Sequence, residues 1–451
     1  MQHHPPSKDR LTRFLDNPRK ALWRIAAPMM AGFTVHALYS IVDSIFIGKL
    51  GAEALAASGY IGAIFFAAIA LTNGLSTGIT ACVARAYGAR QQERMNQLAS
   101  NGLLLSMTVG TVFTALGLLV GPRLISLLGA SGTTAAFAWE YMFPLWLGMP
   151  LFFFSTALRS VINGEGDART PMIILAMSTT LNLLLDPIFI FVLDLGIAGA
   201  SYATILAHGF ALLVLIYVVF AKKRLSTRYS IKSMAPSREL LSAIIGIGLP
   251  ATMGQLVMAA GMIVVNKILS SFGQIAVAGY VAGNRVDMVV ALPLLGIASA
   301  TMTLVGMYSG ANRSDLVRFT TLYAYRWGVA VSILLGGTIY LFADHVVGLF
   351  VADGDAIQIG RQYLGYAVFA YPLMAVGMTT GRILQGLGFG WPSLIITSVR
   401  VLLFGALGAY VAVFMFDAGI HSVWMSFIAG GIGALFLSAY WIRKHLWKGN
   451  M

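Results

Sequence analysis

The sequence predicts an all-α integral membrane protein with twelve transmembrane helices. Of its 451 residues, 58% are apolar and only 10% are charged, whereas about a quarter of the residues in an ordinary soluble domain are charged. The mean hydropathy is +0.80. A soluble chain of this length needs more polar surface than 30 basic and 17 acidic residues provide. The composition therefore excludes a soluble enzyme, and the pattern of apolar segments and basic residues defines the fold further.

Twelve segments are apolar over roughly the 20 residues that cross the hydrocarbon core of a bilayer. The first follows a polar N-terminus and continues past Asp43, which makes it too long for the apolar part of a signal peptide. Several segments exceed about 25 residues, so we expect them to be tilted, kinked or extended beyond the lipid. The predicted spans are 22–47, 54–83, 97–120, 135–161, 170–193, 198–220, 240–269, 276–308, 325–347, 360–384, 392–416 and 420–442.

The basic residues alternate with these spans. If the N-terminus is cytoplasmic, the inner segments hold 24 of the 30 lysines and arginines, and the outer loops hold only Lys49 and Arg123. This asymmetry follows the positive-inside rule. We therefore predict a cell (inner) membrane protein with both termini in the cytoplasm. The net charge of +13 then requires no nucleic-acid partner, and the single cysteine, Cys82, excludes an intramolecular disulfide.

The chain contains an internal repeat. A shift of 222 residues aligns matching residues from span one to span four without gaps, and because these 222 residues contain six spans, the two repeats share one orientation. The predicted domains are an N-terminal six-helix lobe (1–220), a basic cytoplasmic linker (221–239) and a C-terminal six-helix lobe (240–451). Two such lobes favour a transporter with its substrate site between them. Matching pairs include Pro28 and Pro250, Gly51 and Gly273, Gly74 and Gly296, and Pro150 and Pro372.

Three acidic residues lie well inside predicted spans: Asp43, Asp186 and Asp287. A charged group in hydrocarbon is costly, so each is a candidate functional residue. The helical rise of about 1.5 Å per residue places Asp43, Asp186 and Thr204 in one layer of the N-terminal lobe. Asn182 lies one helical turn from Asp186 and therefore shares its face.

These side chains are hard oxygen donors, which suit a proton or a small hard cation. Ala200 lies one turn from Thr204 and can offer its carbonyl, and Pro187 leaves a further backbone acceptor without its donor. The candidate ligands of a sodium ion are Asp43, Asn182 and Thr204. The alternative is a buried polar cluster that only fixes helix packing.

The C-terminal half offers fewer charged groups. Arg285 and Asp287 lie in span eight and Arg400 in span eleven, where either an ion pair or contact with a substrate would explain them. Pro28 and Pro250 each remove a backbone donor inside a span and bend the helix, and Pro28 is predicted to be a hinge. Three histidines are predicted to serve packing or interfaces: His36, His208 and His421.

Several sequence runs resemble a multidrug and toxic compound extrusion (MATE) transporter over essentially the whole chain. They are AAPMMAGFTVHALYSIVDSIFIGKLG (26–51), RSVINGEGDARTP (159–171), LNLLLDPIFIFVLDLGIAGASYAT (181–204), GLPATMGQLV (248–257) and GRILQGLGFGWPS (381–393). The NLLLDP run and the absence of acids in spans seven and ten are most similar to the DinF-like branch. The NorM-like branch carries further acids in the C-terminal half, where this sequence has only Asp287 within a span.

The resemblance implies two lobes around a V-shaped central cavity and export of bulky cationic or amphipathic compounds, driven by inward flow of H⁺ or Na⁺ without a cofactor. It implies that Asp43, Asn182, Asp186 and Thr204 form an ion site with the carbonyl of Ala200. Tyr141 falls next to that site, and Pro28 matches a bending proline. The candidates for lining or gating a substrate cavity are Pro28, Tyr39, Tyr141, Arg285 and Asp287.

Three other functions stay open at this point. A flippase for a lipid-linked oligosaccharide would need a strongly basic cavity, and only Arg285 and Arg400 lie deep in the membrane. A channel would conduct without exchange. A membrane enzyme is disfavoured because no hydrolase triad, HExxH motif or nucleotide-binding loop occurs in a plausible setting. We expect a monomer in the lipid bilayer, acting on small molecules.

Overall fold

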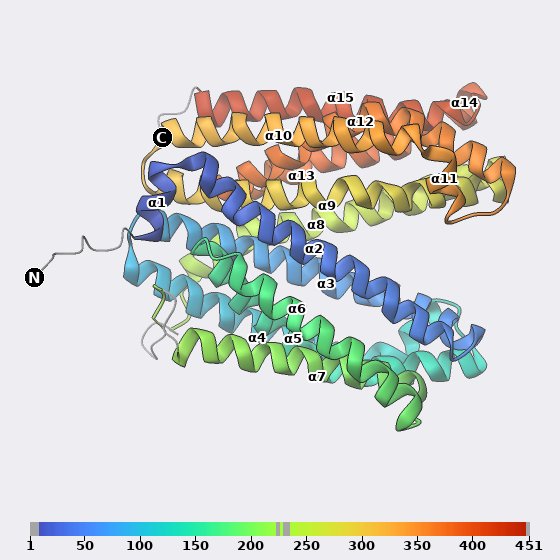
Figure 1. Cartoon of the computed structure of the whole chain (residues 1–451), viewed down its shortest axis with the longest axis horizontal. Coiled ribbons are helices and arrows are strands. Elements are labelled where there is room, and N and C mark those ends of the chain that lie inside the picture. The colour runs from blue at the N-terminus through green and yellow to red at the C-terminus, as the bar shows by residue number, and fades with distance from the viewer. Residues whose placement is uncertain (1–8, 222–225, 229–234, 448–451) are drawn as a thin grey trace, which may run out of the picture. The chain divides into compact units, whose positions relative to one another are not determined.

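The computed structural model describes residues 9–221, 226–228 and 235–447, and these contain helices but no strand. Among these described residues, twelve helices are long and apolar enough to cross a membrane, as predicted. The elements in chain order (Figure 1) are α1 (Arg10–Asp16), α2 (Pro18–Gly48), α3 (Ala52–Gly88), α4 (Gln92–Leu127), α5 (Gly132–Gly164), α6 (Arg169–Pro187), η1 (Ile188–Val192), α7 (Gly196–Ile216), η2 (Tyr217–Ala221), α8 (Arg238–Leu269), η4 (Ser270–Phe272), α9 (Gln274–Gly310), α10 (Ser314–Leu341), α11 (Ala343–Gly348), α12 (Gly354–Leu387), α13 (Gly390–Ser398), η5 (Val399–Gly408), α14 (Ala409–Phe416), α15 (His421–Ile442) and η6 (Arg443–Trp447).

The prediction for the ninth span was wrong at both ends. The helix α10 begins at Ser314 and ends at Leu341, and Ala343–Gly348 forms the separate short helix α11. Phe342 between them has φ −111° and ψ 22°, which departs from helical geometry. Hydropathy alone merged the two helices because apolar residues continue through the break.

The contacts of the chain divide it into two compact units. We call Ala31–Leu249 the N-terminal unit, and Met1–Met30 together with Pro250–Met451 the C-terminal unit. The divisions fall inside α2 and α8, within three residues of Pro28 and Pro250. The start of α2 thus packs with the C-terminal helices, although repeat symmetry places it in the N-terminal lobe.

Each unit has its own aromatic core. In the N-terminal unit, Trp146 and Phe153 of α5 are almost fully buried, and α4 approaches them closely. A Cβ on Gly117 of α4 would lie 2.1 Å from the Trp146 ring, so glycine is needed for this approach. In the C-terminal unit, Trp424 of α15 stacks on Tyr280 of α9 with 5.7 Å between ring centroids.

Segments of π-helix recur in both repeats. They occur at η1 and η2 in the fifth and sixth spans, and at η5 and η6 in the eleventh and twelfth spans. The first directly follows Pro187, which cannot donate a backbone hydrogen bond and so disturbs the α-helical ladder. The last two spans of both repeats thus contain π-helix, although the 222-residue shift does not align η1 with η5.

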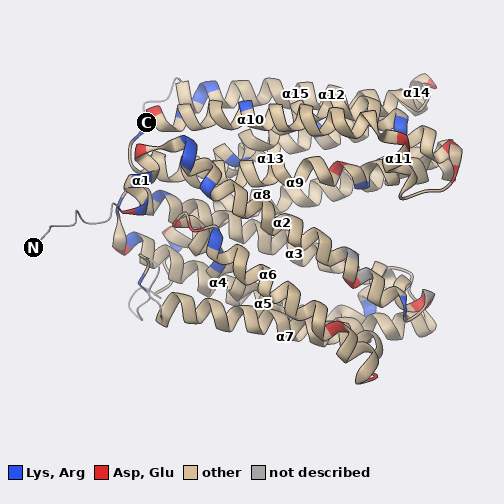
Figure 2. Cartoon of the chain, viewed as in Figure 1, with Lys and Arg blue, Asp and Glu red and all other residues tan. Residues whose placement is uncertain are grey.

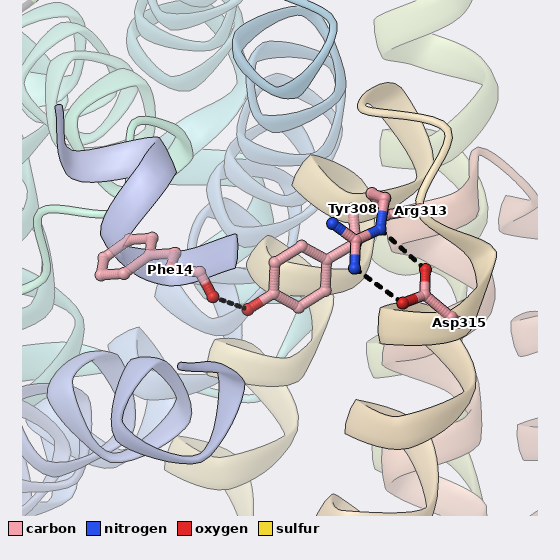
Figure 3. Close-up of polar contacts among 4 residues, drawn as sticks. All are labelled: Phe14, Tyr308, Arg313 and Asp315. Carbon is pink, nitrogen blue, oxygen red and sulfur yellow. Dashed lines mark hydrogen bonds and ion pairs between the residues drawn. The ribbon is translucent and has the colours of Figure 1, made fainter. Parts of the chain in front are cut away.

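The short helix α1 was not predicted from the sequence. Leu11 and Phe14 are buried, and the carbonyl of Phe14 accepts a hydrogen bond of 2.9 Å from Tyr308 Oη at the end of α9 (Figure 3). Nearby, Arg313 donates to both carboxylate oxygens of Asp315, at 2.9 and 2.7 Å. The hydrogen bond of Tyr308 thus attaches α1 to the end of α9, and the Arg313–Asp315 pair lies within the turn that follows.

Part of the predicted linker is bound tightly to the N-terminal unit. Glu165, at the end of α5, is 1% exposed and accepts hydrogen bonds from the backbone amides of Ser226 and Thr227 at 2.7 and 2.8 Å. Thr227 Oγ1 also donates to Glu165, and Asn96 Oδ1 accepts from the amide of Arg228. Asn101 of α4 binds the chain again, at Ala235 and Ser237. Residues 222–225 and 229–234 of the linker lie outside the described residues.

Lysine and arginine gather mainly at one end of the helices within each unit (Figure 2). Exposed examples at such ends are Arg94 at the start of α4 and Arg318 at the start of α10. Most of the remaining helix length carries neither charge, as a hydrocarbon environment requires.

Candidate ion site in the N-terminal unit

The helix α6 carries a buried polar stripe. Ser178, Asn182 and Asp186 recur every four residues and are at most 5% exposed, so they project from one face. Asn182 Nδ2 donates a hydrogen bond of 3.0 Å to Asp186 Oδ1. The stripe places an amide and a carboxylate together in the interior of the unit.

The next helix, α7, packs along this stripe (Figure 1). Ser178 Oγ donates to the carbonyl of Ala207 at 2.8 Å, which sets the register of the antiparallel pair. Toward the other end, a Cβ on Gly199 would lie 2.6 Å from the backbone of Phe189 in η1. The small residue thus lets α7 approach the π-helical turn that follows Pro187.

The helix α2 adds the second carboxylate. Asp43 lies near enough to Asp186 for their charges to interact, and both interact with Tyr39 and Tyr141. Tyr39 Oη lies 3.4 Å from Thr204 Oγ1 on α7. Thr204 in turn donates to the carbonyl of Ala200 at 2.9 Å, so α2, α5, α6 and α7 all contribute to the cluster.

The cluster contains three buried oxygen atoms that accept no hydrogen bond from any described residue: Asp43 Oδ1, Asn182 Oδ1 and Asp186 Oδ2. A buried acceptor without a donor costs about 1–3 kcal/mol. Three acceptors of this kind in one cluster fit a proton on a carboxylate or a small hard cation such as Na⁺. Among the described residues, no three His, Cys, Asp or Glu side chains could hold a metal ion, so the donors here are two carboxylates and neutral oxygens.

Two residues beside the cluster were not assigned to it from the sequence. His208 lies one turn beyond Thr204, its Nδ1 is 2.9 Å from the carbonyl of Thr204, and its ring lies 5.2 Å from that of Phe152. Arg159 of α5 donates to Thr156 Oγ1 at 2.6 Å and lies close enough to His208 to interact electrostatically. The i,i+4 spacing from Thr204 was the available signal for His208.

The acid of the C-terminal unit, Asp287, has a different environment. Tyr363 and Tyr371 of α12 donate to its two carboxylate oxygens at 2.5 and 2.6 Å, and Asn284 Nδ2 lies 3.3 Å from Oδ2. Arg285 is exposed, and its guanidinium carbon lies 5.9 Å from the centre of the Phe350 ring. The printed partners of Asp287 in the described part of the chain are thus neutral groups, and its role as an ion-pair partner or a substrate contact stays a prediction.

Pro28, the predicted hinge, lies fifteen residues before Asp43 on α2 and is buried in the C-terminal unit. The helix continues through it without a break from Pro18 to Gly48. The functional candidates therefore fall into three places: the oxygen cluster of the N-terminal unit, the surroundings of Asp287, and the point in α2 where the division between the units falls.

Comparison with known proteins agrees with this arrangement. The sequence model of the MatE family matches residues 28–188 and 250–411, one segment in each repeat. The probable multidrug resistance protein NorM of Thermotoga maritima is 27% identical over 436 residues, which cover 94% of each chain. A crystal structure of a MATE protein in complex with MaL6 superposes with a TM-score of 0.92 and 32% identity, covering 97% of this chain and 99% of that one. A multidrug resistance MATE family transporter in an outward-facing conformation gives 0.92 and 31%, covering 98% of both chains.

Proposed function

Because this chain belongs to the MatE family, whose members are membrane transporters and not enzymes, we propose that it is a secondary active multidrug efflux transporter. It exchanges bulky cationic or amphipathic compounds for H⁺ or Na⁺. The proposal extends to this chain the activity in the names of its relatives, a probable multidrug resistance protein and a multidrug resistance transporter. The assignment to the DinF-like branch stays a prediction.

The single observation that carries the proposal is the set of unpartnered buried oxygens on Asp43, Asn182 and Asp186. In the proposed cycle, a proton or sodium ion enters this cluster from the outside and neutralises one carboxylate. Tyr39 and Tyr141 lie close to both carboxylates and would change their orientation with the charge. Thr204 and the carbonyl of Ala200, already joined by a hydrogen bond, complete the oxygen set for Na⁺.

The proposed movement is a rocker-switch exchange in which the lobes open alternately to the two sides of the membrane. The bend is assigned to Pro28, where α2 leaves one compact unit for the other. Loss of the backbone hydrogen bond at a proline makes bending less costly at that residue. Ion uptake at Asp43, on the same helix, would bias the bend and so couple ion entry to drug release.

Asp287 is proposed to contact the cationic substrate. Its carboxylate already accepts from two tyrosines and an asparagine, so its charge is held in one place by neutral groups. Aromatic rings surround it, and the Tyr280 and Tyr363 centroids lie 5.2 Å apart. A fixed negative charge beside aromatic faces attracts organic cations. Arg285, which is exposed, is proposed to lie at the edge of the substrate site around Asp287.

The proposed location is the cell (inner) membrane with both termini in the cytoplasm, since this places 24 of the 30 basic residues on the inner side. The protein is proposed to act as a monomer, because each unit contains its own core.

Reconstitution into vesicles tests the function. Efflux of a fluorescent organic cation is measured with a proton gradient alone, a sodium gradient alone, and neither. Transport driven by one gradient and lost in Asp43→Asn supports the proposal. Equal flux without any gradient would identify a channel, and transport of a lipid-linked sugar without export of cations would identify a flippase.

A further inference from the structure

A groove of about 570 Å³ lies on the C-terminal unit, which does not contain the oxygen cluster. Its floor is α12, which packs against both α10 and α15 (Figure 1). The volume falls in the range of about 300–1,000 Å³ that is typical of ligand pockets. The lining includes Tyr340 of α10, Gln358, Arg361, Gln362 and Phe369 of α12, and Ile428 of α15.

The chemistry of the groove changes along α12. Gln358, Arg361 and Gln362 lie near the start of the helix at Gly354, whereas Phe369 lies about 12 Å beyond Arg361 along the helix axis. Phe369 is 69% exposed and Ile428 lines the groove from α15. The groove thus has a polar, cationic end and an apolar end, one above the other on a membrane-spanning helix.

This face is separate from the surroundings of Asp287. Tyr363 and Tyr371 project from α12 to Asp287 and are at most 5% exposed. They do not line the groove. The groove therefore needs an explanation of its own.

Hydrogen-bond donors are available at the polar end. Arg361 is 55% exposed, and Nη1 donates to Asp344 Oδ2 of α11 at 2.7 Å. A guanidinium has five N–H donors, and the other four make no hydrogen bond to a described residue. The amides of Gln358 and Gln362 also have no hydrogen-bond partner among the described residues. One fixed cation beside two free amides is suited to a phosphodiester with its neighbouring ester carbonyls.

The apolar end has room for a hydrocarbon chain. Gly365 lies between the two ends, and a Cβ there would already be 3.3 Å from the Tyr340 ring. A larger side chain at Gly365 would occupy the passage from Arg361 to Phe369. Glycine at this position keeps the groove continuous.

We propose that this groove binds one phospholipid from the leaflet adjoining the start of α12. The phosphate lies at Arg361 with the glutamine amides, and one acyl chain passes Gly365 to reach Phe369 and Ile428. A lipid bound in this way would fill the groove between α10 and α15 and tie α11, through Asp344, to the same site. The inference concerns a lipid site and does not depend on transport.

Native mass spectrometry of the full-length protein tests it. Detergent-purified protein is titrated with phosphatidylglycerol, and the dissociation constant of the first bound lipid is measured. Arg361→Ala is expected to weaken binding about tenfold, because it removes a charge-assisted hydrogen bond to the phosphate. Gly365→Leu is expected to weaken binding by a similar factor, because its side chain blocks the path of the acyl chain.

Two matched variants separate the site from general effects. Asp344→Asn breaks the same ion pair but keeps Arg361, so lipid binding is expected to persist or tighten. Arg94→Ala removes another exposed arginine with a comparable ion pair, to Glu239 at 3.0 Å, and is expected to leave binding unchanged. Equal affinities in Arg361→Ala and Arg94→Ala would overturn the proposal. So would complete displacement of the lipid by an equimolar amount of inorganic phosphate, because that result would leave no role for the acyl chain.

Discussion

At the scale of single residues, burying the acceptors of the oxygen cluster without donors costs free energy of folding, and helix packing alone does not explain why they are present. Asp186 is fully buried and has one carboxylate oxygen bound to Asn182 and one without a donor among the described residues. Replacing a buried charge by a neutral group of the same shape can stabilise a fold, because the desolvation cost disappears. A sequence selected only for stability would thus not favour an aspartate here.

Asp186→Asn should therefore fold as well as the parent and unfold at the same or a higher temperature. Gradient-driven efflux should fall strongly, by about tenfold or more, because an asparagine carries no charge to attract a cation and takes up no proton. Thermal unfolding and vesicle transport, both at matched protein amounts, check the two parts. Parental transport rates in this variant would remove Asp186 from the coupling mechanism.

Gly117 shows a purely structural constraint. Alanine has a better helix propensity than glycine by about 1 kcal/mol, yet a Cβ at Gly117 would lie 2.1 Å from Trp146. Gly117→Ala should lower stability by about 1–3 kcal/mol through overpacking. A Cβ at Gly209 on α7 would meet no neighbouring atom within 4 Å, so Gly209→Ala should be neutral or stabilising. Thermal unfolding of both variants makes the comparison, and equal effects would contradict the packing argument.

At the scale of elements, α2 combines the hinge candidate and an ion-site residue. The division between the compact units falls two residues after Pro28, inside a helix that stays continuous to Gly48. Proline there removes the hydrogen bond to the carbonyl of Arg24. A helix that belongs to both units can transmit a bend from one to the other only if it stays helical on both sides of the flexible point.

Pro28→Ala should lower the transport turnover about tenfold and change substrate affinity less than about twofold, because the restored hydrogen bond stiffens α2 without removing a site residue. Turnover in vesicles and equilibrium binding of the fluorescent cation separate the two quantities. Pro122, an exposed proline inside α4, provides the control: Pro122→Ala should change neither. A loss of binding as large as the loss of turnover would argue against a hinge.

Glu165 makes three of the hydrogen bonds that attach the linker to the N-terminal unit, beside those of Asn96 and Asn101. Glu165 accepts two backbone amides and one hydroxyl from residues 226 and 227. In Glu165→Gln, an NH₂ group replaces one carboxylate oxygen and cannot accept a hydrogen bond from the linker. The free energy that holds the linker on the N-terminal unit should therefore fall by about 1–3 kcal/mol.

The measurement is the rate of tryptic cleavage in the linker, which contains Lys222 and Lys223, and about a tenfold increase is expected from a weakening of this size. Glu93→Gln is the matched control, since Glu93 is exposed and accepts a long hydrogen bond of 3.5 Å from Gln97 on the same helix. Cleavage at the parental rate in Glu165→Gln would show that other contacts hold the linker.

At the scale of the whole molecule, duplication left two units with different polar chemistry. The 222-residue shift pairs Asp43 with Val265, which is 4% exposed in the core of the C-terminal unit. It pairs Asp186 with Gly408. The acid that the C-terminal unit does have, Asp287, is engaged by neutral donors. Ion coupling should accordingly reside in the N-terminal unit alone.

Asp43→Asn should abolish the dependence of efflux on the ion gradient, whereas Asp287→Asn should keep that dependence and weaken the apparent affinity for cationic substrates. The two variants are compared in one vesicle assay, at several gradient strengths and substrate concentrations, with the protein quantified in each. Uncoupled transport in Asp287→Asn together with parental behaviour in Asp43→Asn would place the ion path in the C-terminal half.

The sequence by itself determined the membrane class, the twelve spans, the repeat and the family, because hydropathy and residue spacing are local properties of the chain. It also predicted that Asn182 and Asp186 lie side by side, since residues four apart share a helix face. The prediction of a Thr204 contribution rested on depth counted along single helices, and the 3.4 Å contact between Thr204 and Tyr39 is consistent with it.

Only the tertiary structure decided which groups meet across long separations in the chain. Asp287 finds its donors 76 and 84 residues away, on a neighbouring helix, and no local pattern predicts them. The short helix α1 forms where Tyr308 binds it, and α2 is shared between the units. The groove is lined by side chains of α10, α12 and α15, and a Cβ on Gly365 of α12 would lie 3.3 Å from Tyr340 of α10. Such features depend on how helices pack, which is set by the shapes of many side chains at once and not by the periodicity of any one segment.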